Sequence, residues 1–267
     1  MRPITFLSDY GYADDFAGVC RGVIASIAAE ARVIDITHGI ERHDVRAAAL
    51  VLRNALPYFP AGVHLAVVDP GVGGARRAVA LRTADDRLLV GPDNGVLWLA
   101  AQRLGGVVEA VDVGRSRWRL EPVSATFHGR DVFAPVSAHL ARGEPLAAAG
   151  DPCDPRGLEA VALPHARVEA GTLVAHAIAG DRFGNLALDA GADDLYSAGV
   201  APGSPCQIEA GGQRIRARCA ATFADVPAGA LLVYEDSFGQ LAVAVNRGSA
   251  AERLGVARDD ELRIHPG

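Results

Sequence analysis

The order of apolar runs and helical segments divides the chain into two parts. From Ile4 to about Leu146, short apolar runs alternate with longer segments of helical periodicity, which is the pattern of a layered α/β domain. From Arg167 onward helical segments nearly disappear, and short apolar runs recur with turn signals such as Gly211-Gly212 between them. Regular short strands of this kind predict a small β-barrel or sandwich. We therefore expect an N-terminal α/β layered domain over residues 1–160 and a small C-terminal all-β barrel domain over residues 167–267.

Each predicted helix of the first part begins behind an aspartate or asparagine, whose side chain can accept hydrogen bonds from the free N–H groups of a first helical turn. These helices are Phe16–Ala29 behind Asp14 and Asp15, Val45–Leu56 behind Asp44, Val96–Leu104 behind Asn94 and Val132–Leu140 behind Asp131. The predicted strands are Ile4–Leu7, Val33–Ile36, Leu65–Val68, Ala78–Arg82, Leu88–Val90 and Val107–Val113, then Thr172–Ile178, Leu186–Leu188, Cys206–Ala210, Arg214–Cys219, Leu231–Tyr234, Leu241–Val245 and Glu261–Ile264. Residues 143–164 are rich in Pro, Gly and Asp without periodicity and predict a linker.

Composition limits the possible partners. The net charge is −6, which argues against a surface that binds nucleic acid by neutralising phosphates, so we expect a small-molecule partner. No Cys-x-x-Cys, His-x-x-x-His or His-x-Glu pattern occurs, so neither a disulfide framework nor a metal site is indicated. The chain enters a predicted strand without a leader and has no apolar run long enough to span a bilayer. We expect a cytoplasmic protein without a metal or a membrane partner.

The stretch from Val67 to Arg77 carries the densest chemistry. An apolar strand runs into Asp69, a glycine-rich bend follows, and the guanidinium groups of Arg76 and Arg77 precede another predicted strand. A dinucleotide-binding fingerprint needs spaced glycines that open a helix, whereas Gly71-x-Gly73 here opens a strand. The loop is therefore interpreted as a charged reaction site and not as a pyrophosphate cradle.

Polar residues also follow other predicted strands, where ligands bind in open α/β sheets. Asp9 follows the first strand and, like Asp69, is a candidate for function. For His38, Asp93 and Asn94, a role as turn residue or helix cap is the favoured interpretation. No Gly-x-Ser-x-Gly elbow supports a serine nucleophile.

Further clusters lie later in the chain. His128 stands in a loop at a predicted helix entrance, where a histidine is placed to titrate or to accept a proton. In the second part, Asp181-Arg182-Phe183-Gly184-Asn185 is echoed by Asp236-Ser237-Phe238-Gly239-Gln240. Hairpin turns with a packing Phe explain both segments. Binding of a planar heterocycle, with the rings stacking on it and an amide at its edge, explains them equally well.

Taken together and in order, these motifs resemble the S-adenosyl-L-methionine hydroxide adenosyltransferases, the adenosine-forming hydrolases related to fluorinase and chlorinase. The resemblance implies an N-terminal α/β domain, a C-terminal β-barrel, and a homotrimer that holds its ligand between the first domain of one subunit and the barrel of its neighbour. The motifs are Leu7-Ser8-Asp9-Tyr10-Gly11 with Asp14, Asp69-Pro70-Gly71-Val72-Gly73 with Arg76-Arg77, Gly91-Pro92-Asp93-Asn94-Gly95, Thr126-Phe127-His128-Gly129-Arg130-Asp131, Phe183-Gly184-Asn185 and Ser237-Phe238-Gly239.

The resemblance also implies roles for individual residues. Asp69, Arg76 and His128 match a water-activating triad, and Asp9 matches a carboxylate that grips the ribose hydroxyls. The remaining substrate contacts that it implies are Phe183 and Asn185 at the adenine, Ser237 at the methionine portion, Phe238 and Val245 at neighbouring positions, and Asp14, Thr126 and Phe127 within the motifs above; Asp181 lies near the family's methionine-ammonium contact.

The implied reaction is attack of activated water at C5′ of S-adenosyl-L-methionine, with no cofactor. The sulfur leaves as a neutral thioether, so the difficult part is the nucleophile, which must be held in line in a dry site. An arginine beside Asp69 and His128 would favour the carboxylate and disfavour the imidazolium, which leaves two possible proton acceptors. A halogenase is the nearest alternative, although a carboxylate at Asp69 would repel a halide. A non-catalytic sensor of S-adenosyl-L-methionine or a nucleoside is the other.

Overall fold

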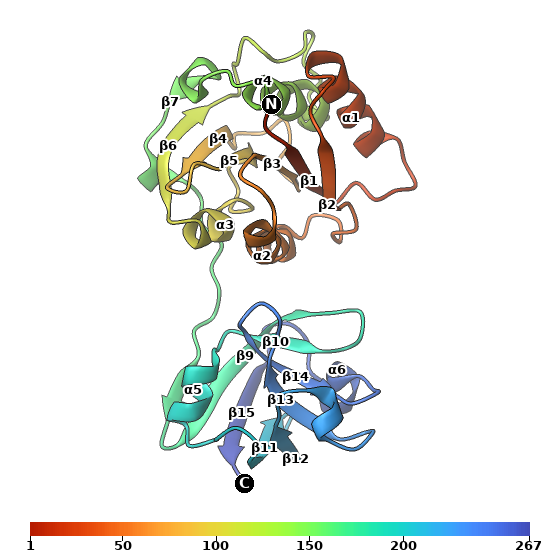
Figure 1. Ribbon diagram of the computed structural model, residues 1–267, viewed down its shortest axis with the longest axis vertical. Helices are drawn as coiled ribbons and strands as arrows, with labels where there is room; N and C mark the ends of the chain where they lie inside the picture. Colours follow the sequence, from red (N-terminus) through yellow and green to blue (C-terminus); the bar gives the residue numbers. More distant parts are fainter. The chain divides into compact units, whose positions relative to one another are not determined.

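The computed structural model describes residues 1–267 and divides into two compact units, Met1–Val161 and Ala162–Gly267. The first unit is built on a sheet with the strand order β2-β1-β3-β5-β4-β6-β7 (Figure 1). Every strand predicted in this unit is present, with ends that differ by no more than two residues. The strands are β1 Ile4–Ser8, β2 Val33–Thr37, β3 Val63–Val67, β4 Ala78–Thr83, β5 Leu88–Pro92, β6 Val107–Asp112 and β7 Asp151–Pro152.

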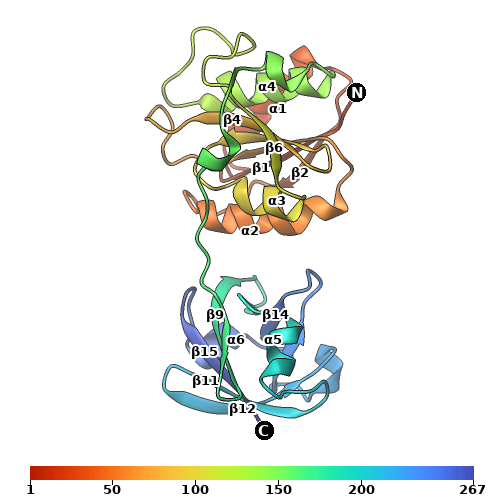
Figure 2. The same ribbon diagram turned by 90° about the vertical axis from the view of Figure 1, so that its left-hand side faces the viewer.

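Helices cover both faces of this sheet, which gives the three layers seen in Figure 2. Helices α1 (Phe16–Ile27) and α4 (Ala134–Ala141) lie on one face, and α2 (Val45–Ala55) and α3 (Trp98–Arg103) lie on the other. Successive strand residues point to opposite faces, so Phe6 packs in the α1/α4 core and Leu7 in the α2/α3 core. The predicted α/β domain is confirmed.

The direction of β4 decides where the chemistry lies. Strands β1, β2, β3 and β5 are mutually parallel, whereas β4 runs antiparallel to β5, with Ala78 opposite Pro92. The beginning of β4 therefore lies at the same sheet edge as the ends of β3 and β5. The residues just before β4 and just after β3 meet at this edge.

Only one of the predicted helix caps is formed. Asp44 Oδ1 accepts the Ala47 N–H at 3.0 Å and caps α2. Asp15 precedes α1 without a side-chain cap bond, and Asn94 accepts from Val96 N–H in a turn before α3 begins. Asp131 lies inside a π-helical turn, Gly129–Phe133, and accepts the Ser124 N–H at 2.8 Å. Its carboxylate thus ties two loops together, and the prediction of a cap there was wrong.

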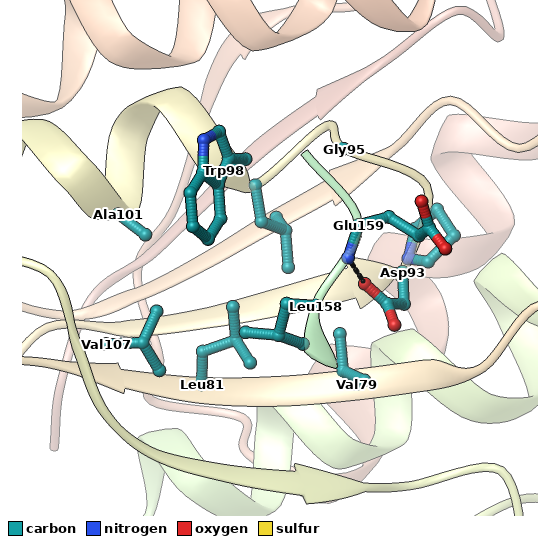
Figure 3. A pocket seen from close by; sticks show the side chains of 11 residues that line it. Val79, Leu81, Asp93, Gly95, Trp98, Ala101, Val107, Leu158 and Glu159 are labelled. Atoms are coloured by element: carbon teal, nitrogen blue, oxygen red, sulfur yellow. Dashed lines mark hydrogen bonds between the residues drawn. The ribbon is translucent and has the colours of Figure 1, made fainter. Parts of the chain in front are cut away.

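Most of the predicted linker belongs to the first unit. Strand β7 extends the sheet beside β6, and Asp93 Oδ1 accepts the Glu159 N–H at 2.9 Å. Leu158 packs near Trp98 over the sheet, around a cavity of about 10 Å³ (Figure 3). Because that volume holds about one water, this cavity is no ligand site.

The second unit is a barrel. Its strand order is β10-β14-β13-β12-β11-β15-β9-β8, and pairing of β9 with β10 closes the sheet, with β8 outside β9. The predicted hairpin at Gly211-Gly212 joins β11 to β12. Two short helices, α5 Ala192–Ser197 and α6 Ala250–Leu254, were not predicted. The strands are β8 Arg167–Glu169, β9 Thr172–Gly180, β10 Leu186–Leu188, β11 Pro205–Ala210, β12 Gln213–Cys219, β13 Leu231–Glu235, β14 Leu241–Val245 and β15 Glu261–Pro266.

The helices of both units are short or mixed in polarity, and none of them combines the length and apolar character needed to cross a bilayer.

Candidate active site

Asp69 and Arg76 form an ion pair at the sheet edge where β3 ends and β4 begins. Arg76 Nε donates to Asp69 Oδ1 at 2.9 Å, and Arg76 Nη2 donates to Oδ2. The two side chains are only 7% and 12% exposed. The guanidinium also lies over the ring of Phe133, 5.4 Å from its centroid. A paired, buried arginine of this kind presents a carboxylate in a fixed orientation.

His128 joins this pair through the same guanidinium. Arg76 Nη2 lies 2.9 Å from His128 Nδ1. Burial of the imidazole lowers the pKa of His128 below its ordinary value, and the nearby positive charge of Arg76 lowers it further. The structure thus brings together the three residues that the resemblance assigned to water activation.

A glycine lets the two loops of the site touch. Gly73 has a φ of 74°, and a Cβ built on it would lie 2.2 Å from the carbonyl oxygen of Ala125. No other residue fits this position without movement. The backbone contact holds the loop of Asp69 and Arg76 against the segment that leads to His128.

Asp69 and His128 face a cavity of about 340 Å³, which is within the range of small-molecule sites. The predicted site residues that line it are Asp9, Asp14, Asp69, Thr126, Phe127 and His128. Arg76 stands behind them and instead lines a second cavity of about 520 Å³, together with His128 and Arg77. The other lining residues, to which the sequence analysis assigned no role, are Tyr10, Phe16, Arg42, His43, Val67, Val72 and Gly129.

The largest of these additional residues are aromatic. The ring of Phe127 lies 5.9 Å from that of Tyr10 and 5.1 Å from that of Phe16, both edge to face. Burial raises the pKa of the Tyr10 phenol, which therefore stays neutral. Tyr10 directly follows Asp9, and its position beyond a strand end was an available signal. Phe16 begins a helix and resembles a core residue in the sequence, yet it is 41% exposed.

The carboxylate of Asp9 is oriented by backbone. Its Oδ2 accepts the N–H of His43 at 2.9 Å. The neighbouring Ser8 hydroxyl is buried and bonds His38 Nδ1 at 2.7 Å. Ser8 and His38 do not line the cavity, so they fix the loop that carries Asp9 and Tyr10 without reaching a ligand.

Asp93 and Asn94 do not line this cavity either. Asp93 pairs with Arg77, and Asn94 Nδ2 donates to the carbonyl oxygen of Val68 at 2.9 Å. Both side chains make structural contacts.

The barrel carries two turns of matching geometry. Asp181 Oδ1 accepts the N–H groups of Phe183 and Asn185, and Asp181 Oδ2 accepts Asn185 Nδ2 at 2.8 Å. Asp236 likewise accepts the N–H groups of Phe238 and Gln240. Both oxygens of Asp181 are thus used within its own turn. The turns project Phe183 and Phe238, which are 71% and 43% exposed.

The other predicted barrel contacts differ in exposure. Ser237 is exposed in the second turn, whereas Val245 is 7% exposed within the barrel core. All four cysteines, Cys20, Cys153, Cys206 and Cys219, are free thiols, and no group of three or more His, Cys, Asp or Glu side chains is arranged to hold a metal ion.

Comparison with known proteins shows which family this chain resembles in sequence. Residues 4–150 match the SAM hydroxide adenosyltransferase N-terminal domain, and residues 175–263 match the C-terminal domain of the same family. An (R)-S-adenosyl-L-methionine hydrolase from Salinispora tropica is 50% identical over 99% of this chain and 98% of its own. A fluorinase from Actinopolyspora mzabensis is 30% identical over 98% and 97%.

A solved structure has the same fold over nearly the whole chain. The crystal structure of an uncharacterized conserved protein from Thermotoga maritima superposes with a TM-score of 0.92 at 38% identity, and covers 98% of this chain and 99% of its own. The matched segments span both units and include the loops of Asp69, Arg76 and His128. The chain belongs to the S-adenosyl-L-methionine hydroxide adenosyltransferase family.

Proposed function

We propose that this protein hydrolyses S-adenosyl-L-methionine to adenosine and L-methionine. The observation that carries the proposal is the set of contacts joining Asp69, Arg76 and His128 beside a cavity of about 340 Å³. The name of the Salinispora relative specifies the R epimer at sulfur, and we propose the same epimer as substrate here. Water attacks C5′, the C5′–S bond breaks with its electron pair going to sulfur, and one proton is released.

The first unit supplies the groups that act on water. A fixed carboxylate and a neutral imidazole at the cavity wall hold a water molecule in one orientation, and the position beside a cationic sulfonium favours developing hydroxide character. Asp9 reaches the same cavity and is proposed to bind the ribose hydroxyls. The sulfonium leaves as a neutral thioether, so we propose that neither a metal nor a cofactor takes part.

The barrel is proposed to bind the base and the amino acid. Asn185 Nδ2 is held by Asp181, which leaves its Oδ1 free to accept from the exocyclic amine of adenine. Phe183, exposed on the same turn, would stack on the base. Ser237 is proposed to contact the methionine portion, with Phe238 and Val245 nearby.

An assay of both sulfonium epimers tests the activity. We expect equal amounts of adenosine and L-methionine from the R epimer in the presence of chelator, measured by chromatography, and about 10²–10⁴-fold slower release with Asp69→Asn. Ligand that binds but returns unchanged would identify a sensor. A halogenated nucleoside would identify a halogenase. The Asp69 carboxylate counts against that activity, because it and a halide about 4 Å away would repel each other by roughly 4 kcal/mol at an effective dielectric of about 20.

We further propose a cytoplasmic homotrimer in which the first unit of one subunit and the barrel of the next complete each site. Heterologous contacts of this kind close into a ring. Asp69→Asn chains mixed with Asn185→Ala chains, after dissociation and reassociation, should regain activity at junctions that receive both intact faces. A solution mass of one chain, or no recovery in verified mixed oligomers, would refute the shared site.

A further inference from the structure

The contact between Arg76 and His128 fixes where the imidazole carries its proton. A guanidinium has only donors, stays protonated in proteins, and therefore requires an acceptor at each contact. His128 Nδ1, 2.9 Å from Arg76 Nη2, must supply a lone pair. In a neutral imidazole one nitrogen accepts and the other donates, so the proton of His128 lies on Nε2.

The charged groups that face His128 favour this neutral form. They are Arg76 before β4, Asp69 after β3, and Asp131 in the turn that begins beside His128 itself. Burial and Arg76 together outweigh the two carboxylates and keep the pKa of His128 below its ordinary value. A second proton, on Nδ1, would also point at a guanidinium hydrogen and break the contact.

The other ring nitrogen, Nε2, is the one left for a ligand, because His128 also lines the cavity of about 340 Å³. His128 lines both cavities, whereas Arg76 lines the second cavity and is not part of the substrate-cavity wall. The Nδ1 of the ring is thus committed to Arg76, and only Nε2 is left for a water molecule beside Asp69.

We propose that His128 acts as a hydrogen-bond donor to the attacking water through Nε2–H, and that Asp69 is the group that accepts the proton. This inference rests on the proposed hydrolysis. The only lone pair of the neutral ring is held by Arg76, so His128 has no free basic site. Asp69 does have one, because a carboxylate offers about four lone-pair positions and Arg76 occupies two of them.

The reaction balances with these roles. One lone pair of the water accepts the Nε2–H of His128, which leaves the other directed at C5′. As the C–O bond forms, the C5′–S bond breaks and its electron pair goes to sulfur. One water proton passes to the Asp69 carboxylate and then to solvent, and the other remains as the 5′-hydroxyl of adenosine.

Two substitutions separate a donor from a base. Glutamine reaches as far as Nε2 and carries an N–H donor without a basic nitrogen, whereas asparagine reaches only as far as Nδ1. We expect His128→Gln to lose no more than about tenfold in kcat, and His128→Asn to lose about 10²–10⁴-fold, the range of a positioned proton-transfer group. Equal, large losses in both variants would overturn the donor assignment.

The pH profile and the proton position give readouts that a structural role would not move. Activity of the native enzyme should fall as the pH drops through the pKa of His128, and His128→Gln should lack that limb. Nitrogen-15 NMR of the labelled protein should show a protonated Nε2 and an unprotonated Nδ1, assigned by the signals that disappear in His128→Gln. A protonated Nδ1 would refute the inference even in an active enzyme, whereas absence of any hydrolysis with the expected tautomer would refute the proposed function alone.

Discussion

Substitution of Gly73 by alanine should move the loop that carries Asp69 and Arg76 away from His128. The new Cβ would lie 2.2 Å from the carbonyl oxygen of Ala125, about 1.2 Å short of the 3.4 Å at which ordinary contact begins. The Ala125 carbonyl oxygen is a backbone atom and the new Cβ is bonded directly to the backbone, so neither atom can move aside as the end of a flexible side chain would. The loop that carries Asp69 and Arg76 must therefore shift by roughly 1 Å relative to His128.

That shift sets the expected size of the effect. A misplacement of about 1 Å in a catalytic constellation costs about 10²-fold in rate. Alanine at the φ of 74° costs a further 1–2 kcal/mol or so of stability through left-handed backbone strain. Gly106→Ala is the matched control, because Gly106 also has a positive φ, of 89°, but a Cβ there meets nothing within 4 Å.

The assay is kcat for adenosine release alongside thermal unfolding of both variants. Both should lose a few degrees in Tm, since about 1 kcal/mol corresponds to roughly 2–4 °C in units of this size. Only Gly73→Ala should lose about 10²-fold in kcat. If Gly73→Ala unfolds like Gly106→Ala and keeps native kcat, the close backbone contact at Gly73 does not position His128.

Further predictions concern kinetics and acid stability. Asp69→Asn and His128→Ala should each lower kcat by about 10²–10⁴-fold with little change in substrate binding. Asn185→Ala should chiefly raise KM, because an amide that contacts the base acts in ground and transition states alike. Steady-state kinetics measures both effects, and equal losses of substrate binding in all three variants would show that the roles are misassigned. Burial lowers the pKa of His64 to about 3, and Arg87 adds to the shift. Since the unfolded chain takes up this proton near pH 6.5 and the folded protein does not, stability is lost as the pH falls below about 6.5, by roughly 1.5–2 kcal/mol between pH 6.5 and pH 5. Glutamine cannot be protonated, so urea unfolding of His64→Gln should show a loss of stability between pH 6.5 and pH 5 that is smaller by this amount. A loss equal to that of the native protein would contradict the lowered pKa of His64.

The fold could be predicted wherever an element is long enough to show a period. Each apolar run that was expected to be a strand is a strand in the structure. These runs could be recognised because alternation and β-branched residues are visible over several positions. Strand β7 has two residues and helix α5 has six, so neither presents a repeat that can be recognised. The antiparallel direction of β4 left a signal that was not used. Only residues 84–87 separate β4 from β5, and so short a connection excludes a parallel crossover.

The site was harder to predict where a carboxylate has two possible uses. Asp69 and Asp181 both follow a strand and precede a glycine-containing turn, and their sequence contexts do not separate them. The three-dimensional neighbours do. Asp181 lies beneath the N–H groups of its own turn and orients Asn185, while Asp69 lies opposite an arginine seven residues away, beside a cavity. The two carboxylates thus differ in which donors reach them, and that depends on packing far from either motif.

The identity of residue 76 follows from the same geometry. Its side chain must donate to both oxygens of Asp69 and to His128 Nδ1, which takes one Nε–H and two Nη2–H groups in nearly one plane. A guanidinium offers this fork, whereas an ammonium on a flexible stem is a compact point charge with no fixed plane. Because β4 runs antiparallel to β5, its first residues place the guanidinium of Arg76 at the end of β3. The backbone contact at Gly73 holds the segment of His128 beside the same guanidinium. Arginine therefore does more than neutralise a carboxylate. By occupying Nδ1 it selects the tautomer of His128, and with it the group that remains to take the proton from water.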